Sequence, residues 1–478
     1  MKKISIGHIL LSFFKIHCQD IPHKDWAYKR KIYEILRGAG GVYIKFLQVL
    51  AVSHKFMDGW STIKDYEVFN QVDEEFIDVK KYLLHQEQYK SIDTIPFAKG
   101  SFAQVYKATL LNDKKVVLKV LRPSVYNNLD KDLKKLHVLV KIFKYFLPDS
   151  IVDYEDAFIE FARNTKMETD YENEIANIKY FANYYKNHPS VIVPKVYDYL
   201  CSSTIIVEEY MDGVALADLI TNKDIDFSLA EQSNLWKQIV IVGGEALRTA
   251  MVSDYVYGDP HLGNILLLND GKVALVDFGL VAKKPISQEA FYLWVKAYYD
   301  ILLGKNTFEG LLKTTCMCFC PDITNALNKY FGTPDLISSL ASILNQDAKE
   351  ALQNNDKAAY ITQNGHLLSL FLDYVNSTKA LRLKLDMQNY QLLKAMQAFI
   401  GSVTILTHQK FEEAYVSIML ASMKYALDEV ENKGVVHDYS LKTSYSKNES
   451  YELLIGFLTN IANSDESLFD KIMERMCL

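Results

Sequence analysis

The chain has 478 residues, of which 49% are hydrophobic and 23% charged, and its formal net charge is −6. This composition allows a large buried core, and the weak negative charge gives no electrostatic reason to bind nucleic acid. Six cysteines are too few for a disulfide framework, which favours a reducing, cytoplasmic location. Since no run of about twenty apolar residues occurs, we expect no transmembrane helix and only peripheral contact with a membrane.

The N-terminal part of the chain changes its periodicity once. Residues 24–90 are rich in Lys and Glu and have apolar positions three and four apart, so they predict a helical extension. From Ile95 the pattern becomes that of strands, over 97–108 and 115–120, around a turn at Asn112-Asp113.

The remainder of the chain is mostly helical. A long helical stretch is predicted over 129–184, broken near Pro148, and two β-rich runs follow at 191–199 and 204–209. Beyond Ala215 we expect helices around one short hairpin. The expected fold is α+β, with three parts: a helical N-terminal extension over 1–90, a small β-containing lobe with a helical insert over 91–210, and a helical lobe over 211–478.

The hairpin predicted in the helical lobe is flanked by oxygen-bearing side chains. The chain reads Asp259-Pro-His-Leu-Gly-Asn264 on one side and Asp277-Phe-Gly279 on the other. Between these motifs, two apolar runs enclose Asn269-Asp270-Gly271, which is a strong hairpin signal. The three side chains therefore belong to the two ends of one short ribbon.

This spacing is typical of a magnesium-nucleotide site in protein kinases. There, one Asp lies near the acceptor hydroxyl, and an Asn and a second Asp hold the metal ions that bridge the ATP phosphates. Oxygen ligands suit Mg²⁺ because it is a hard cation. We therefore predict Asp259 as a catalytic residue and Asn264 and Asp277 as metal ligands, with ATP and Mg²⁺ as cofactors.

A phosphotransfer site of this kind needs a lysine and a cover for the phosphates. Lys119 lies in the strand-like run Val116-Val-Leu-Lys-Val, where a kinase places the lysine that contacts the α- and β-phosphates. Upstream, the segment Ala98-Lys-Gly100-Ser101-Phe-Ala-Gln-Val has the length of a glycine-rich loop but keeps one glycine. We expect Ala98, Gly100, Ser101 and Glu209 to contact the nucleotide.

The acidic partner of Lys119 is expected in the segment Glu168-Thr-Asp170-Tyr-Glu-Asn-Glu174. Glu174 shares a helical face with Asp170 and precedes Ile175 and Ile178, which would face the core, so we assign it as the partner of Lys119. Glu168 and Asp170 have an alternative explanation as the acidic first turn of a helix, which the helix dipole favours.

Together these residues resemble the UbiB/ADCK group of atypical protein-kinase-like proteins, also called AarF domain-containing. The resemblance runs from about Gly40 to Lys283. Its five signatures are the KxGQ-like Lys45-Phe-Leu-Gln48, the loop at Ala98–Val105, the ExD motif Glu168-x-Asp170 followed by Glu174, the Asp259–Asn264 motif and Asp277-Phe-Gly279.

The resemblance implies a two-lobed kinase-like fold in which the KxGQ helices cover the nucleotide site. Lys45 and Gln48 would then lie near Glu168 and Asp170 and close the path that a protein substrate would take. This implies an ATPase or small-molecule phosphotransferase that supports ubiquinone or other isoprenoid-lipid metabolism, with a lipid or isoprenoid small molecule as a partner.

The chain departs from the family pattern at three positions. Leu47 replaces the glycine of the KxGQ motif, and Leu262 replaces a proline in the Asp259–Asn264 motif. Gly100 replaces an alanine of the family loop, which brings the loop closer to that of a conventional kinase. We therefore expect stronger phosphotransfer than in a typical member of the family.

Two other functions remain open on the sequence. A small-molecule phosphotransferase or a protein kinase could share this fold and this metal site. A nucleotide-dependent scaffold without catalysis would also retain the fold, although it would not need Lys119, Asp259, Asn264 and Asp277 intact.

Overall fold

The computed structural model describes residues 42–43, 45–46, 76–100, 102–146, 154–221, 229–258, 260, 262–283, 288–303 and 411–432. The chain divides into two compact units. The first comprises Met1–Lys186, Val193–Met211 and Asp277–Leu280, and the second comprises Asn187–Ile192, Asp212–Val276 and Val281–Leu478.

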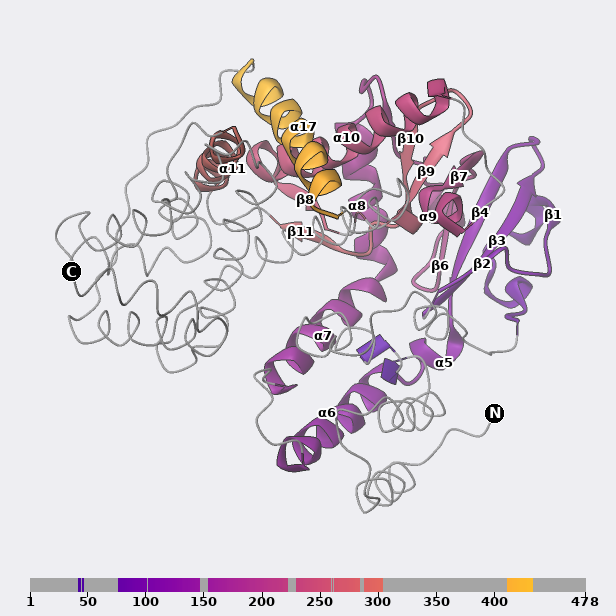
Figure 1. The fold of residues 1–478 in the computed structure, drawn as a ribbon. Helices are drawn as coiled ribbons and strands as arrows, with labels where there is room; N and C mark the ends of the chain where they lie inside the picture. Colours follow the sequence, from indigo (N-terminus) through magenta and orange to yellow (C-terminus); the bar gives the residue numbers. More distant parts are fainter. Residues whose placement is uncertain are drawn as a thin grey trace. The chain divides into compact units, whose positions relative to one another are not determined.

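The first unit contains an antiparallel sheet (β1–β4 are purple in Figure 1) with the strand order β1-β3-β4-β6, in which β2 pairs with β3. The strands are β1 (Tyr89–Ile92), β2 (Ala98–Lys99), β3 (Ala103–Leu110), β4 (Lys115–Leu121) and β6 (Ile205–Glu209). Asp113, with φ of 60°, turns the chain from β3 into β4. Asp tolerates this left-handed conformation better than most residues.

The two faces of this sheet have different characters. One face is an apolar core built from alternate residues of β3, β4 and β6, including Tyr106, Leu118 and Val207. Lys119 pairs with Ile206 across the ladder between β4 and β6, and Val117 pairs with Glu208. Since successive side chains alternate between faces, Lys119 and Glu208 share the face opposite to the apolar core.

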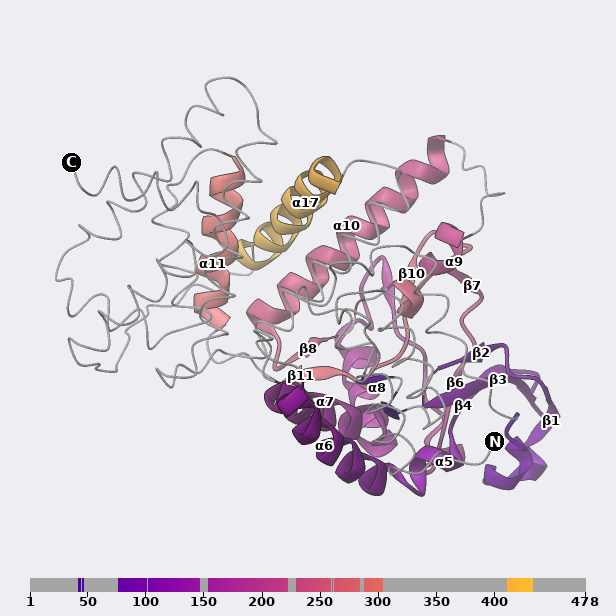
Figure 2. The same cartoon turned by 60° about the horizontal axis from the view of Figure 1, so that its bottom comes forward.

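Among the described residues of the first unit, 42–43 and 45–46 are helical, and the helices with bounds are α5 (Pro123–Tyr126), α6 (Leu129–Phe146), α7 (Tyr154–Glu168) and α8 (Tyr171–Tyr184). Helices α6 and α7 lie side by side in both views (Figures 1 and 2). Asp170 is the N-cap of α8, and its side chain accepts a hydrogen bond from Asn173 N. This cap separates α7 from α8 within the stretch that the sequence predicted as helical.

Three predictions about the first half of the chain were wrong in part. The described end of the predicted helical extension holds two 3-10 helices, η1 (Val79–Tyr82) and η2 (Gln86–Gln88), and then β1, because Tyr89–Ile92 pairs with β3. The predicted strand over 97–108 is two strands, β2 and β3. The predicted β-rich run over 191–199 contains the two-residue β5 (Val191–Ile192) and the 3-10 helix η3 (Asp198–Leu200).

The second unit contains the predicted hairpin. Strands β9 (Ile265–Leu268) and β10 (Val273–Leu275) pair antiparallel, and Gly271 supplies a positive φ of 80° in the turn between them. The sheet has the order β5-β10-β9-β7, where β7 is Gly213–Ala215. A separate pair is formed by β8 (Tyr255–Tyr257) and β11 (Val281–Lys283). The sequence prediction of this hairpin is confirmed.

Helices make up most of the remaining described residues of the second unit: α9 (Leu216–Thr221), α10 (Leu229–Val252), α11 (Gln288–Leu302) and α17 (Phe411–Glu431), besides the 3-10 helix η4 (Leu262–Asn264). Helices α10 and α17 pack against each other (Figure 2). Buried Glu245 of α10 contacts Arg248 at 2.6 Å and accepts a hydrogen bond from the Tyr425 hydroxyl of α17 at 2.9 Å. The hydrogen bond joins the two helices, and the ion pair within α10 holds the Glu245 carboxylate in place.

Within the described ranges, no helix is long and apolar enough to cross a membrane. The rest of the predicted C-terminal helical region, at 304–410 and 433–478, lies outside the described residues, as does most of the predicted N-terminal extension.

Candidate functional site

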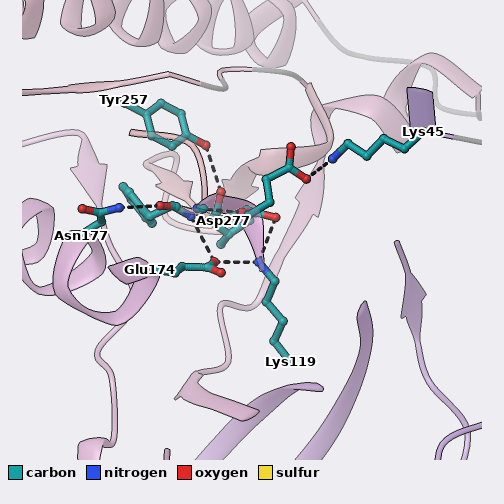
Figure 3. Close-up of polar contacts among 10 residues, drawn as sticks. Lys45, Lys119, Glu174, Asn177, Tyr257 and Asp277 are labelled. Atoms are coloured by element: carbon teal, nitrogen blue, oxygen red, sulfur yellow. Dashed lines mark hydrogen bonds and ion pairs between the residues drawn. The ribbon is translucent and has the colours of Figure 1, made fainter. Parts of the chain in front are cut away.

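Lys119 of β4 lies between two carboxylates. Its Nζ is 2.7 Å from Oε1 of Glu174, on α8, and 3.1 Å from Oδ2 of Asp277 (Figure 3). The Glu174 side chain is 1% exposed and the Lys119 side chain 15%, whereas that of Asp277 is 43% exposed. The structure thus brings together three residues predicted from the sequence, and the most accessible of them is the predicted metal ligand.

The two carboxylates respond differently to the shared ammonium group. Burial raises the pKa of Glu174 to about 7, and the Lys119 ammonium offsets this only in part. Burial also opposes ionisation of Asp277, but Lys119 and a hydrogen bond from Gly279 N outweigh it and lower the pKa to about 2. Burial disfavours the Lys119 ammonium, yet Asp277 and Glu174 hold its pKa well above the usual value. A charged lysine beside an ionised aspartate is therefore the resting state of this site.

Helix α8 fixes the segment that carries Asp277. Phe278 N donates to Glu174 Oε1 at 3.4 Å, and Asn177 Nδ2 donates to Phe278 O at 3.0 Å. The Phe278 ring stacks on Phe181 with 5.3 Å between ring centroids. Glu174, Asn177 and Phe181 follow one another at helical spacing on one face of α8. The sequence analysis missed Asn177 and Phe181, although this spacing after Glu174 could have indicated them.

The Asp277 backbone adopts a left-handed conformation, with φ of 66°. Its Oδ1 accepts a hydrogen bond from Gly279 N at 3.1 Å, so the side chain stabilises its own turn. A Cβ at Gly279 would lie 3.3 Å from Asp277 Oδ1 and 3.5 Å from the Glu168 Cα. A side chain at position 279 would therefore need a small shift of the Asp277 carboxylate. Val276, directly before Asp277, accepts a hydrogen bond from the Tyr257 hydroxyl at 3.0 Å (Figure 3).

Lys45 and Glu168 form an ion pair, with side chains 25% and 17% exposed (Figure 3). The Lys45 Nζ also lies 4.7 Å from the centroid of the Phe102 ring. These contacts join Lys45 to the end of α7 and to Phe102, just before β3. Asp170, by contrast, acts as the N-cap of α8, which is a structural role close to the alternative that the sequence left open.

The loop between β2 and β3 is held by a buried arginine. Gly100 N donates to Ala103 O at 2.9 Å, and Gly100 O accepts from Arg122 Nε at 3.2 Å and Nη2 at 3.0 Å. Arg122 is 1% exposed, and Ala98 and Lys99 pair with Val105 and Gln104 of β3. The sequence analysis missed Arg122, whose position directly after β4 was the available signal.

We expect Gly100→Ala to leave the fold intact and to change only nucleotide binding. A Cβ there would meet nothing closer than Ala103 O at 3.8 Å, which is an ordinary contact. The melting temperature should therefore stay within about 2 °C. If Gly100 brings the backbone closer to phosphate, affinity for Mg-ATP and autophosphorylation should both fall several-fold. Unchanged affinity and autophosphorylation would contradict our expectation that Gly100 strengthens phosphotransfer.

The other predicted site residues lie outside the described residues, in the second unit or on the other face of the sheet. Gln48, Ser101 and Asp259 lie outside the described residues. Asn264 is buried in η4 of the second unit, where its carbonyl oxygen accepts from Val276 N at 2.9 Å. Glu209 ends β6 with an exposed side chain on the opposite sheet face from Lys119, and its Oε2 accepts from Lys195 N at 3.4 Å.

A strand lysine that contacts a helix glutamate and the aspartate of an Asp-Phe-Gly motif defines a protein-kinase-like domain. Residues 68–300 match the family described as "ABC1 atypical kinase-like domain". The chain belongs to this family of atypical kinase-like proteins, which is the UbiB/ADCK group that the sequence motifs indicated.

Relatives in plants and animals carry the corresponding names. Activity of BC1 complex kinase 1, a chloroplastic protein of Arabidopsis thaliana, is 30% identical over 53% of this chain and 38% of its own length. AarF domain-containing kinase 1 of Drosophila melanogaster is 31% identical over 41% of this chain and 37% of its own. A chloroplastic aarF domain-containing protein kinase of Arabidopsis thaliana is 25% identical over 78% of this chain and 70% of its own length. This chain therefore spans less than half the length of the first two relatives.

Proposed function

We propose that this chain binds Mg-ATP and acts as an atypical kinase or ATPase. The observation that supports this most directly is Lys119, held by Glu174 and Asp277 on the sheet face opposite to the apolar core. A lysine fixed by two carboxylates keeps its charge and its direction, which suits an ammonium that contacts phosphate oxygens.

The side chains present fit a magnesium ion at Asp277. This carboxylate is ionised, 43% exposed and fixed by Gly279 N, so it can offer an oxygen ligand. Asn264 is the second ligand that the sequence predicts, and Asp259 would orient the acceptor hydroxyl or water. A bound Mg²⁺ would neutralise charge on the phosphate oxygens. Lys119 would hold phosphate oxygens from the side of the sheet, and Glu174 would keep Lys119 in place.

The Lys45–Glu168 ion pair supports a restricted acceptor. Lys45 is paired with Glu168, whose Cα would lie 3.5 Å from a Cβ at Gly279. We infer that a protein substrate would have to displace Lys45, whereas water or a small molecule would not. We therefore propose ATP hydrolysis or transfer to a small acceptor, and we extend to this chain the family's link to ubiquinone and other isoprenoid lipids.

The first test is binding and turnover by the full chain. We expect saturable ATP binding by calorimetry that requires magnesium, and phosphate release that increases with liposomes carrying phenolic isoprenoid precursors. In Lys45→Ala, loss of the ion pair should open the site and raise phosphate transfer to a generic protein acceptor. Absence of nucleotide binding by a folded wild type would overturn the proposal, and binding without turnover would favour a scaffold.

The variant Lys179→Ala is the control for Lys45→Ala. Lys179 on α8 pairs with Asp198 at 2.5 Å and is 52% exposed, so Lys179→Ala also removes one lysine ion pair. It should leave protein phosphorylation at the wild-type level. If both variants change transfer equally, the Lys45–Glu168 pair has no special part in closing the site.

A further inference from the structure

Arg122 is a buried cation next to the strand that carries Lys119. It follows β4 directly and is 1% exposed. Arginine is rarely buried to this extent unless hydrogen bonds or ion pairs hold its guanidinium, because removal of the charge from water is costly. A leucine or methionine would fill the same space without that cost. The contacts of the guanidinium therefore indicate why arginine occupies this position.

The main chain and the side chain of Arg122 hold the same loop. Arg122 N donates to Phe102 O at 2.8 Å, while Nε and Nη2 donate to Gly100 O at 3.2 Å and 3.0 Å. Hydrogen bonds from a charged donor are stronger than those between neutral groups. The loop between β2 and β3 is thus fixed at the carbonyl groups of Gly100 and Phe102.

Gly100 explains why this loop needs an external restraint. Glycine has more backbone freedom than any other residue, so a loop that carries it loses more entropy when it is ordered. The hydrogen bond from Gly100 N to Ala103 O closes the loop but does not fix the Gly100 carbonyl. The two bonds from the Arg122 guanidinium supply that second restraint.

Arg122 approaches the loop from the side of the sheet that carries the apolar core. Its backbone is extended, with φ of −63° and ψ of 127°, and it continues the ladder in which Leu121 pairs with Ala103. Since side chains alternate along an extended strand, Arg122 and Lys119 leave the chain on opposite faces. A ligand at Lys119 would therefore meet the loop and not the guanidinium.

We propose that Arg122 is a positioning residue that holds the loop between β2 and β3 ready to cover the phosphates of a nucleotide bound at Lys119. Because Ala103 pairs with Leu121 and Val105 with Lys119, the end of the loop and Lys119 belong to one ladder. A loop that is ordered before binding loses less entropy when the ligand arrives, which strengthens binding. This inference rests on the proposed nucleotide-binding function and adds a residue that acts on the phosphates through the loop.

The test compares ligands with and without phosphates. Binding of ATP, ADP and adenosine is measured with magnesium for the wild type and for Arg122→Lys, which keeps the charge but replaces the fork of donors by a single ammonium. The affinities for ATP and ADP should fall by about tenfold, as expected for the loss of a charged hydrogen bond. The affinity for adenosine, which has no phosphate, should stay within about twofold. Arg163→Lys, at an exposed position of α7, is the matched control and should behave as the wild type.

Steady-state kinetics and a second substitution separate positioning from a general structural role. In Arg122→Lys the KM for ATP should rise by about tenfold while kcat stays within about threefold, since Lys119 and Asp277 are unchanged. In a Gly100→Ala background the same substitution should weaken ATP binding by only about threefold, because alanine already restricts the loop. Equal losses in the two backgrounds would show that Arg122 does not act by restraining Gly100, which contradicts the inference.

Hydrogen exchange in the wild type tests the same point without a substitution, so it decides the inference even if Arg122→Lys does not fold. The amides of Gly100 and Arg122 should be protected before nucleotide is added, because both are hydrogen-bonded within the loop. Saturating Mg-ATP should slow their exchange by less than about threefold. Protection that arises only with nucleotide would overturn the inference, since the ligand would then order the loop.

The outcomes distinguish this inference from the function on which it rests. An equal loss of affinity for ATP and adenosine would make Arg122 a structural residue only. If the folded wild type binds no nucleotide, the proposed function fails and this inference fails with it. If the wild type binds ATP and Arg122→Lys binds it equally well, the inference alone fails.

Discussion

Replacing Lys119 with methionine should reduce ATP turnover by about 10²–10³-fold, because the change removes a charge-bearing donor to the phosphates while keeping the side-chain length. It should also destabilise the fold. Glu174 would lose its cation while it stays buried at 1% exposure, and removal of one partner of a buried pair typically costs about 3 kcal/mol. Phosphate-release kinetics and denaturant unfolding at pH 7 measure the two effects.

The loss of stability should depend on pH in a defined direction. The folded-state pKa of Glu174 is already raised from 4.5 to about 7, and removal of the ammonium would raise it further. A carboxyl with a raised folded pKa contributes stability below its unfolded pKa, and this is lost as the pH rises through the folded pKa. The Lys119→Met protein should therefore be closest to the wild type near pH 5 and least stable near pH 8.

A second substitution separates stability from function. Adding Glu174→Gln to Lys119→Met removes the buried ionisable carboxyl and keeps an acceptor for Phe278 N. The double variant should regain more than half of the lost unfolding free energy and none of the turnover. If turnover returned with stability, Lys119 would be a structural cation and its assignment to the phosphates would be wrong.

The sequence predicted those parts of the site that depend on local patterns. The β9–β10 hairpin follows from two apolar runs around Asn269-Asp270-Gly271, and Lys119 could be assigned because strand β4 is apolar on both sides of it. The partner glutamate was found because Glu174 has the spacing of a core-facing helical residue. In each case a few neighbouring residues carry the information.

The remaining features depend on pairings between distant segments. Asn177 acquires its role from Phe278, and Arg122 from Gly100, and neither partner can be identified from local periodicity. Glu208 appears in the sequence as one of two adjacent acids that end a strand. The ladder register alone shows that Glu208 faces Lys119 and Glu209 does not. The same limit explains the error at 76–90, where pairing of Tyr89–Ile92 with β3 overrides a helical pattern.

Replacing Asp277 with asparagine should abolish metal-dependent turnover and spare the fold. Asparagine tolerates the left-handed φ of 66° and can still accept the hydrogen bond from Gly279 N. The loss of the ion pair with Lys119 should cost no more than about 1 kcal/mol, because the Asp277 side chain is 43% exposed and solvent screens the pair. Turnover should fall by at least about 10³-fold, since a neutral amide is a poor ligand for Mg²⁺.

The pH dependence and a matched variant make this prediction specific. The pKa of Asp277 is lowered from 3.8 to about 2, so its contribution to stability is present above pH 3.8 and is lost as the pH falls through 2. The wild type and Asp277→Asn should therefore converge in stability near pH 2.

Asp277→Ala loses the turn hydrogen bond and the tolerance of a positive φ, and should be less stable than Asp277→Asn by about 1–2 kcal/mol. Magnesium titration of ATP binding decides the role of the carboxylate: if Asp277→Asn binds ATP with wild-type magnesium dependence, Asp277 is no metal ligand and its ion pair with Lys119 is structural.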